Sequence, residues 1–573
     1  MKKTFLMITM LLLSLVLIAC GGDNGGETEE IRFYLWNADG SYPQGFEEVV
    51  NTFNEGAGKD LNISLDFSFD TLDDYKTQLN LTMSANQDTY DVVFDAGWIY
   101  LNVFANEGYY YDLSSYFNNS AYPGLKNAFQ EDFINNNLWN NGVYGIPLTE
   151  TFGEIAVTYL RKDWREEAAS DITWEKPASI STLDVEASDL SNGVDSFEEM
   201  EYYLYWVKDN KPGITPALSN SDATWGAWDI ISGHQMPTKS AADFVNAGIK
   251  KDIMIKPGVT ADAYIRNEEV MAVNIGSYLN PTSADGIAEF PAGFNTGDDL
   301  WQENYLIARR WAEDAIISPN VLTTNDSDAQ FRAGNGGAVV QSIGQFASVE
   351  QALKTNNADA ELEIFVHNIA LREKLSGYAQ TDYKAWNFLS IPTTVSEAKK
   401  DKIMTFFNWL FLTEENHDLF QYGIKGTHWD EAKDSSNNPI AGTVTTTGME
   451  PYTFTPYVLT WNPSYIRVKH ESDPKVLEYS LYMYDYDRYT GILYSGFQFN
   501  TAASAELTNA LNNPIFASSM TQTTQYYLGQ VNNPIASWNA TLSDRYSNTA
   551  LQTDLVIIQQ AILEQLQAYI DNQ

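Results

Sequence analysis

The sequence predicts an α/β fold with more than one lobe and a helical part at its C-terminal end. Its 573 residues exceed the roughly 100–200 residues of one typical domain. Apolar residues make up 44% of the chain, which is enough to build sizeable cores and excludes a disordered chain. Strand-like and helix-like segments alternate near its start, as they do in parallel α/β lobes.

The first elements are predicted in the order β, α, β. Three segments carry the patterns: 31–36 as an apolar strand, 46–53 as a helix, and 61–69 as an alternating strand. Thr71 and Asp74 have the spacing of a capping box, which predicts a helix through residue 83. The compact segment 91–95 then predicts a buried strand, so the order indicates a parallel sheet.

The later segments predict a second lobe and a long final helix. The break at 145–147 and the alternating segment 154–161 indicate a crossing between lobes. A capping box at 196–199 starts an aromatic-rich helix that ends near residue 208. A strand at 385–391 precedes an apolar helix at 402–411. The last helix, from about residue 549, carries an apolar stripe: Leu551, Leu555, Ile558, Ile562, Leu566 and Tyr569.

Charge and aromatic content narrow the classes of partner. With 34 basic and 76 acidic residues, the formal net charge is −42, which disfavours nucleic acid and anionic lipid. Aromatic residues make up 13% of the chain, with 15 Trp, 34 Tyr and 28 Phe. This surplus predicts aromatic side chains outside the cores as well as in them.

The N-terminal segment is predicted to be a lipoprotein signal peptide. The apolar run 5–18 is short for a membrane span, and residues 17–20 resemble the lipobox of bacterial lipoproteins. The resemblance implies cleavage after residues 1–19, lipidation of Cys20, a flexible linker over 20–30, and tethering at the extracellular face of the cell membrane. An ordinary secretory signal with an incidental cysteine is the alternative. Cys20 is the single cysteine, so an internal disulfide is excluded.

Several segments together resemble a known family. They are 90–95 with Trp98, 144–147, 208–216, 331–340 and 422–429. In this order they resemble the extracellular solute-binding proteins of ABC importers, family 1, which is similar to maltose-binding protein, and especially its large branch of lipoprotein oligosaccharide-binding proteins. Residues 430–530 match the family least.

The resemblance implies a two-lobed, type II periplasmic-binding-protein-like fold with hinge crossovers. The N-terminal lobe is expected over 31–147 and 388–425, and the C-terminal lobe over 148–387 and 426–573. The implied function is capture of a carbohydrate, an oligosaccharide in particular, by hinge closure and its delivery to an ABC transporter permease. The protein is then a monomer and not an enzyme, and its partners are the sugar, the permease and the membrane through its lipid anchor.

A sugar site needs flat aromatic rings for the C–H faces and polar groups for the hydroxyls. In α/β lobes such sites lie beyond the carboxyl ends of the strands. Residues at predicted strand ends and near the crossings are therefore the candidates: Trp36, Asn37, Asp39, Asp95, Trp98, Thr149, Glu150, Ser342, Gln345, Trp386 and Asn387. Trp225, Trp228 and Tyr278 are second-lobe candidates because polar, turn-rich sequence surrounds them. Core packing is the alternative for each aromatic residue.

No cofactor or metal is expected, and enzyme motifs do not stand out. The five histidines form no close ligand pair, which argues against a zinc hydrolase. A bound calcium stays an alternative, with Asp189, Ser191, Gly193 and Asp195 as partial oxygen donors. A surface-anchored polysaccharide-degrading enzyme using two carboxylates is the alternative function. A binding protein for a peptide or other organic solute, and a surface adhesin without transport, also stay open.

Overall fold

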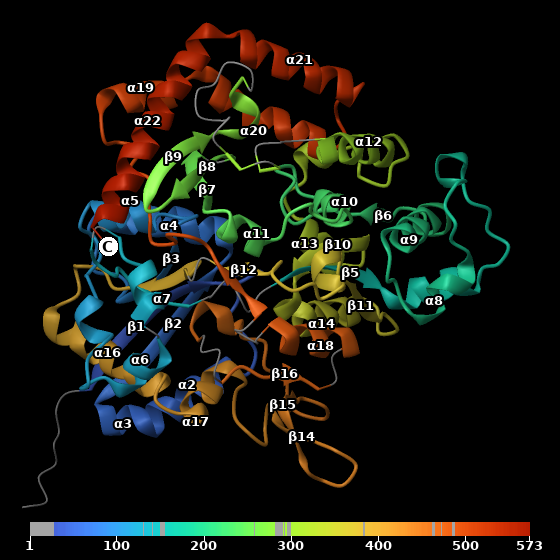
Figure 1. The fold of residues 1–573 in the computed structure, drawn as a ribbon. Helices are drawn as coiled ribbons and strands as arrows, with labels where there is room; N and C mark the ends of the chain where they lie inside the picture. The colour runs from blue at the N-terminus through green and yellow to red at the C-terminus, as the bar shows by residue number, and fades with distance from the viewer. Residues whose placement is uncertain are drawn as a thin grey trace, which may run out of the picture.

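The computed structural model shows two lobes that are each built around a sheet, and a third unit beside them (Figure 1). It describes residues 28–129, 131–139, 141–148, 155–256, 258–280, 290–291, 293–294, 299–381, 384–460, 465–470, 473–483 and 488–572. The predicted signal peptide and Cys20 lie outside these residues. None of the described helices is long and apolar enough to cross a membrane.

The first lobe contains a five-stranded sheet. Its strands, in spatial order, are β2 (Ile63–Asp70), β1 (Glu29–Trp36), β3 (Val92–Ala96), β13 (Asn387–Ser390) and β4 (Ile146–Pro147). β1 pairs in parallel with β2 and β3, as predicted, whereas β13 is antiparallel to both β3 and β4. Two residues of the predicted break at 145–147, Ile146 and Pro147, therefore form a short strand of this sheet.

Helices cover the first sheet and enclose an aromatic core. They are α2 (Phe46–Glu55), α3 (Ala57–Leu61), α4 (Leu72–Ser84), α5 (Leu101–Asn106), α6 (Pro123–Ala128), α7 (Glu131–Asn136), α16 (Glu397–Leu410) and α17 (Glu414–Gln421). Phe33 on β1 contacts Phe67 on β2 and Phe406 on α16 through stacked and edge-on rings. The predicted cap of α4 is present, because the Thr71 hydroxyl oxygen accepts from the amide of Asp74.

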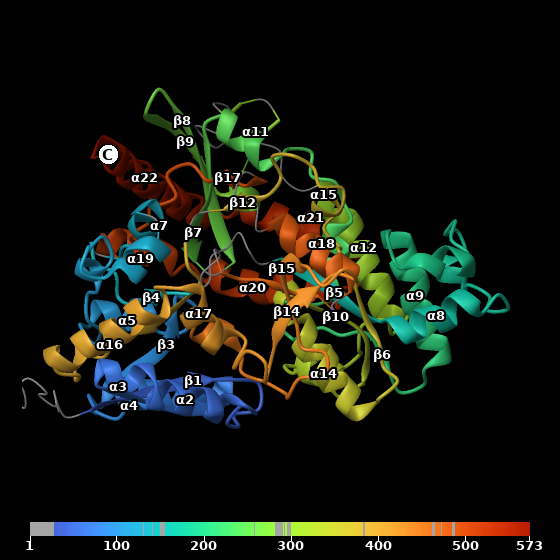
Figure 2. The same cartoon turned by 90° about the horizontal axis from the view of Figure 1, so that it is seen from below.

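The second lobe has its own four-stranded sheet. The strand order is β11 (Leu362–Phe365), β5 (Ala156–Arg161), β10 (Gly336–Ser342) and β6 (Thr215–Ala217). β10 runs parallel to β6 and antiparallel to β5. In both views these strands lie on the opposite side of the molecule from β1, β2 and β3 (Figures 1 and 2).

Two hydrophobic cores flank the second sheet. The helices of this lobe are α8 (Lys162–Ser170), α9 (Phe197–Asn210), α10 (Ala227–Gly233), α12 (Asp299–Glu313), α13 (Ser327–Arg332), α14 (Phe346–Asn356), α15 (Ile369–Arg372), α18 (Pro474–Met483), α20 (Pro514–Tyr527) and α21 (Pro534–Ser547). The predicted capping box at the start of α9 is present: Ser196 Oγ accepts from the Glu199 amide, and the Glu199 carboxylate accepts from the Ser196 amide.

A third unit, which the sequence patterns did not predict, surrounds the final helix. Strands β7 (Ile249–Lys256), β8 (Val259–Arg266) and β9 (Glu269–Asn274) form an antiparallel sheet, and α11 (Ala241–Asn246) lies beside β7. Helices α19 (Ala505–Leu511) and α22 (Thr549–Asp571) close its core against β9. The predicted stripe of α22 is buried at Leu551, Leu555, Ile558, Ile562 and Leu566, with Tyr569 packed at its edge.

The chain passes between the lobes more than once. Two small sheets accompany these passages: β12 (Gln380–Thr381) with β17 (Thr490–Gly491), and β14 (Asp430–Lys433), β15 (Pro439–Thr445) and β16 (Val468–Lys469). Leu459 belongs to the first-lobe core, whereas Val468 belongs to a second-lobe core. Just before Val468, Arg467 forms ion pairs with Asp418 and Glu414 of α17. The predicted lobe boundaries stay a prediction, and the first core also takes in residues beyond 425.

Truncation of the α22 stripe tests the third core. We expect Ile558→Ala to lower the free energy of unfolding of this unit by about 2–5 kcal/mol, because it removes methyl groups from a fully buried site. Urea unfolding followed by circular dichroism measures the change. Val556→Ala is the matched control on the same helix: its side chain is 62% exposed, so we expect a change within about 0.5 kcal/mol. Equal losses in the two variants would contradict this packing.

Candidate functional site

Residues from three distant segments meet at one edge of the first sheet. Trp36 is the last residue of β1, and Trp98 follows two residues after β3. Because β13 runs antiparallel to β3, its first residue, Asn387, pairs with Ala96 at the carboxyl end of β3. The sheet therefore brings Asn387 to the edge where the strand-end rule places Trp36 and Trp98.

Four aromatic rings form a continuous row at this edge. Ring centroids are 6.4 Å apart between Trp98 and Phe94, 6.0 Å between Phe94 and Trp36, and 5.8 Å between Trp36 and Tyr457, all edge-on. We call these four residues the aromatic row. Trp98 is 49% exposed and Trp36 is half-buried, so the row combines a packed base with an accessible ring.

Polar atoms accompany the row. The Trp98 indole N–H donates to the Asn387 Oδ1 at 3.1 Å, which fixes the orientation of the exposed ring. The neighbouring Trp386 is 41% exposed. The Trp36 indole nitrogen is shielded from solvent and has no hydrogen-bond partner in the part of the chain that the structure describes.

Asp95 holds the turn that carries Trp98. It is fully buried, and its Oδ1 accepts from the amides of Ala96 and Tyr100, while Oδ2 accepts from the Tyr110 hydroxyl at 2.7 Å. Burial raises the pKa of Asp95 to about 6, against the opposing effect of these hydrogen bonds. Both carboxylate oxygens are thus occupied within the protein. Asp95, predicted to bind ligand directly, acts here as a positioning residue for Trp98.

The loop after β1 uses its polar residues in a similar way. The Asn37 amide group donates to the Ser41 carbonyl, and its Oδ1 accepts from the Gly40 amide, each at 2.7 Å. Gly40 has a φ of 70°, and a Cβ there would lie 2.8 Å from the Thr71 nitrogen, so glycine is needed. Asp39 is exposed and accepts from Ser41. Asn37 therefore shapes the loop, and Asp39 presents its carboxylate to solvent.

The second-lobe aromatic candidates are mostly engaged in packing. Trp228 is buried and stacks on Tyr527 with centroids 4.0 Å apart. Tyr278 is buried in the third core and donates its hydroxyl to Ser519. The expectation of ligand contact is thus corrected to core packing for these two residues. Trp225 is half-buried in the turn before α10, with a φ of 51°.

The remaining candidates lie near the second sheet or outside the described residues. Ser342 is buried at the end of β10, where its hydroxyl oxygen accepts from the Gly344 amide. Gln345 accepts from the Arg332 guanidinium at 3.0 Å. Both side chains are therefore used in local structure. Thr149 and Glu150 lie outside the described residues.

Two members of the site were missed by the sequence reasoning. Tyr457 contributes the far end of the aromatic row, from a segment that resembles the family least. Its alternation of aromatic residues with Thr and Pro over 451–457 is the signal that could have indicated it. Lys76 of α4 places its ammonium group 5.0 Å from the centre of the Trp98 ring. A single lysine within a helix gives no such signal.

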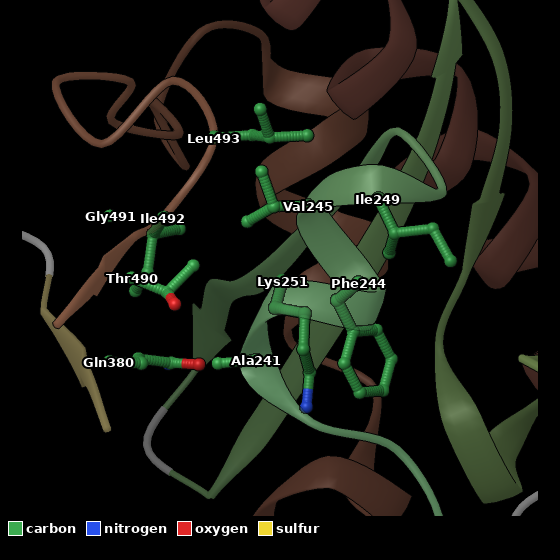
Figure 3. A pocket seen from close by; sticks show the side chains of 10 residues that line it. All are labelled: Ala241, Phe244, Val245, Ile249, Lys251, Gln380, Thr490, Gly491, Ile492 and Leu493. Atoms are coloured by element: carbon green, nitrogen blue, oxygen red, sulfur yellow. The ribbon is translucent and has the colours of Figure 1, made fainter. Parts of the chain in front are cut away.

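A partly open pocket elsewhere is too small for a solute. It is lined by side chains of α11 and β7 and by residues of the strands β12 and β17, with Lys251 beside Phe244 (Figure 3). Its volume of about 10 Å³ admits no more than a single water molecule. The aromatic row, rather than this pocket, is the candidate binding site.

A metal site is not formed by the residues that the structure describes. Among them, no three His, Cys, Asp or Glu side chains gather in a way that could hold an ion. Asp189 accepts from the Glu186 amide, and Asp195 pairs with Lys475 at 2.6 Å. Two of the donors considered for calcium are thus already engaged.

Comparisons with solved structures agree on the architecture. The N-glycan transport solute binding protein NgtS from Streptococcus pneumoniae matches with a TM-score of 0.58 at 16% identity, over 95% of this chain and 99% of that chain. An extracellular solute-binding protein from Bifidobacterium longum subsp. infantis matches with a TM-score of 0.50 at 12% identity, over 96% and 99%. This chain has the fold of the extracellular solute-binding proteins.

The solute-binding-protein fold confirms the predicted two-lobed, type II α/β architecture. The alginate-binding protein AlgQ2, in a structure without calcium ion, also matches, with a TM-score of 0.50 at 13% identity over 95% of this chain and 98% of that chain. NgtS in complex with Man5GlcNAc gives a TM-score of 0.55 at 16% identity, over 95% and 99%. No protein-family model and no curated protein matches the chain.

The raised pKa of Asp95 predicts a pH dependence of stability. Because the folded pKa of about 6 lies above the ordinary value of 3.8, folding favours the protonated carboxyl group. Its contribution to the free energy of unfolding is therefore fully present below pH 3.8 and is lost as the pH rises through about 6. Asn cannot ionise, so we expect the free energy of unfolding of Asp95→Asn not to fall in this way over the same pH range. Urea unfolding across this range measures it, and parallel profiles for the two proteins would contradict the prediction.

Proposed function

We propose that this protein is the solute-binding component of an ABC importer and that its ligand is an oligosaccharide. It changes no chemical bond in the ligand. The observation that carries the proposal is the aromatic row at the carboxyl ends of β1 and β3, with an exposed Trp98 held by Asn387. The fold supports the same class, since the matching structures are solute-binding proteins.

The chemistry of the row suits a carbohydrate. A pyranose ring presents weakly positive C–H groups on its faces, which stack on the electron-rich face of an indole. Its hydroxyl groups can bond to polar side chains such as Asp39, whose carboxylate is exposed in the loop after β1. A purely aliphatic solute would leave these polar groups without partners.

Charge favours a neutral oligosaccharide over an acidic one. The chain carries a formal charge of −42, and Asp39 and Asp73 are exposed near the ends of β1 and β2. A ligand with many carboxylates would be repelled by this surface. NgtS, with its Man5GlcNAc complex, supports a neutral glycan as the first ligand to test.

Binding proceeds by closure of the two lobes around the ligand. The first lobe offers the aromatic row, and the second lobe adds contacts once the sugar is in place. A ligand shifts the population toward the closed form by its greater affinity for that form. The permease then recognises the closed protein. A diacylglycerol anchor on Cys20 holds the protein at the extracellular face of the membrane, which raises its concentration near the transporter.

Ligand-dependent stabilisation tests the proposed function. We expect Man5GlcNAc to raise the melting temperature, because a ligand that binds only the folded state stabilises it. Alginate oligosaccharides and a random peptide mixture serve as acidic and non-carbohydrate comparisons. The sugar recovered after incubation should be unchanged by chromatography. Release of new reducing ends would contradict the binding function and support the polysaccharide-degrading alternative.

Removal of the exposed ring tests the site. We expect Trp98→Ala to weaken binding of the stabilising oligosaccharide by about 1–3 kcal/mol, because the variant loses the stacking surface. Isothermal titration calorimetry measures the affinity. Trp228→Ala is the control, since this ring stacks in the core on Tyr527. It should lower the melting temperature and leave the affinity unchanged, and the reverse pattern would place the site elsewhere.

A further inference from the structure

The exposed Trp98 ring of the site contacts another side chain of the protein. The Lys76 ammonium group lies over the Trp98 ring, 5.0 Å from its centre, which is within the range of a cation–π contact. The face of an indole is also the surface on which a sugar ring stacks. One face of Trp98 is therefore already occupied by a side chain of the protein itself.

The helix that carries Lys76 is firmly placed. The adjacent Tyr75 is fully buried and donates its hydroxyl to the Phe94 carbonyl at 2.5 Å. Thr71 caps the same helix at its first turn. The Tyr75 bond holds the start of α4 against β3, so Lys76 stays within reach of Trp98.

The position of the ammonium group is not explained by an ion pair. In the described part of the chain, no carboxylate lies within ion-pair distance of Lys76, although Asp73 is three residues earlier on the same helix. Asp73 and Asp74 are both exposed on the first turn of α4. The ammonium group contacts the indole face and leaves these nearby carboxylates to solvent.

We infer that Lys76 competes with the sugar for one face of Trp98 and lowers the affinity of ligands that stack on this face. This inference rests on the proposed function. A ligand that stacks on this face must first displace the ammonium group, so it loses part of the stacking free energy. The loss is the same for a single sugar and for an oligosaccharide, because both displace the same contact.

The free energy of the contact between Lys76 and Trp98 sets the expected change in sugar affinity. A cation–π contact at an exposed site is worth about 0.5–1 kcal/mol, which corresponds to a two- to fivefold change in affinity. We therefore expect Lys76→Ala to bind Man5GlcNAc about two- to fivefold more tightly than the wild type. The relative gain should be the same for mannose, because both sugars displace the same contact.

Two measurements test the inference, and one needs no ligand. Acrylamide quenching reports how open the Trp98 ring is, when each protein is compared with its own Trp98→Phe variant. We expect the Trp98 contribution to quenching to rise in Lys76→Ala. Calorimetry with Man5GlcNAc and mannose then gives the change in affinity. Lys59→Ala is the control: Lys59 is an exposed lysine of the first lobe, and its removal changes the net charge equally.

The outcomes separate this inference from the proposed function. Unchanged quenching in Lys76→Ala overturns the inference, whether or not any sugar binds. Weaker binding of Man5GlcNAc by Lys76→Ala also overturns it, since Lys76 would then contact the sugar, while the proposed function stands. If the wild type binds no oligosaccharide and quenching still rises, the contact holds and the proposed function fails.

Discussion

The antiparallel strand β13 is the constraint on which the first lobe depends. β3 and β4 do not pair with each other in the sheet order, and each pairs instead with β13. Buried backbone groups require partners, so this sheet is complete only after the chain returns from the second lobe. Beside this pairing, the side-chain hydrogen bond from Trp98 to Asn387 joins residues 289 positions apart. The strand that returns from the second lobe therefore both completes the first sheet and brings Asn387 to the site.

The sequence could predict where polar residues gather but not which of their atoms remain available. Strand ends are visible as apolar segments followed by polar residues, and this rule located Trp36 and Trp98 at one edge. Asn387 was a candidate because its segment resembles a crossing between lobes. Asp95 obeys the same rule, yet its oxygens are used by the turn and by Tyr110. The partner hydroxyl comes from 15 residues away and from no recognisable motif. Whether a side-chain oxygen is already hydrogen-bonded within the protein depends on the tertiary structure, and a local sequence pattern does not reveal it.

Local signals succeeded where the determining contacts are local. The caps at Thr71 and Ser196 lie within four residues of the amides that they satisfy, and the stripe of α22 follows from helical spacing alone. What covers that stripe is the sheet of β7, β8 and β9, nearly 300 residues earlier, and no pattern linked the two. The aromatic residues show the same limit of local patterns: Trp228 is packed in the core because it stacks on Tyr527, which is far away in the sequence.

The charge of Lys76 explains why this residue can contact the Trp98 ring and still oppose the binding of a sugar. An indole face is negative, and the surrounding surface carries a large excess of carboxylates, so this face attracts any group with positive potential. A sugar C–H face carries weak positive potential, whereas the Lys76 ammonium carries a full charge. Added negative charge near Trp98 would therefore strengthen the lysine contact more than the sugar contact. Tight binding must come instead from additional rings along the row, which the lysine does not reach.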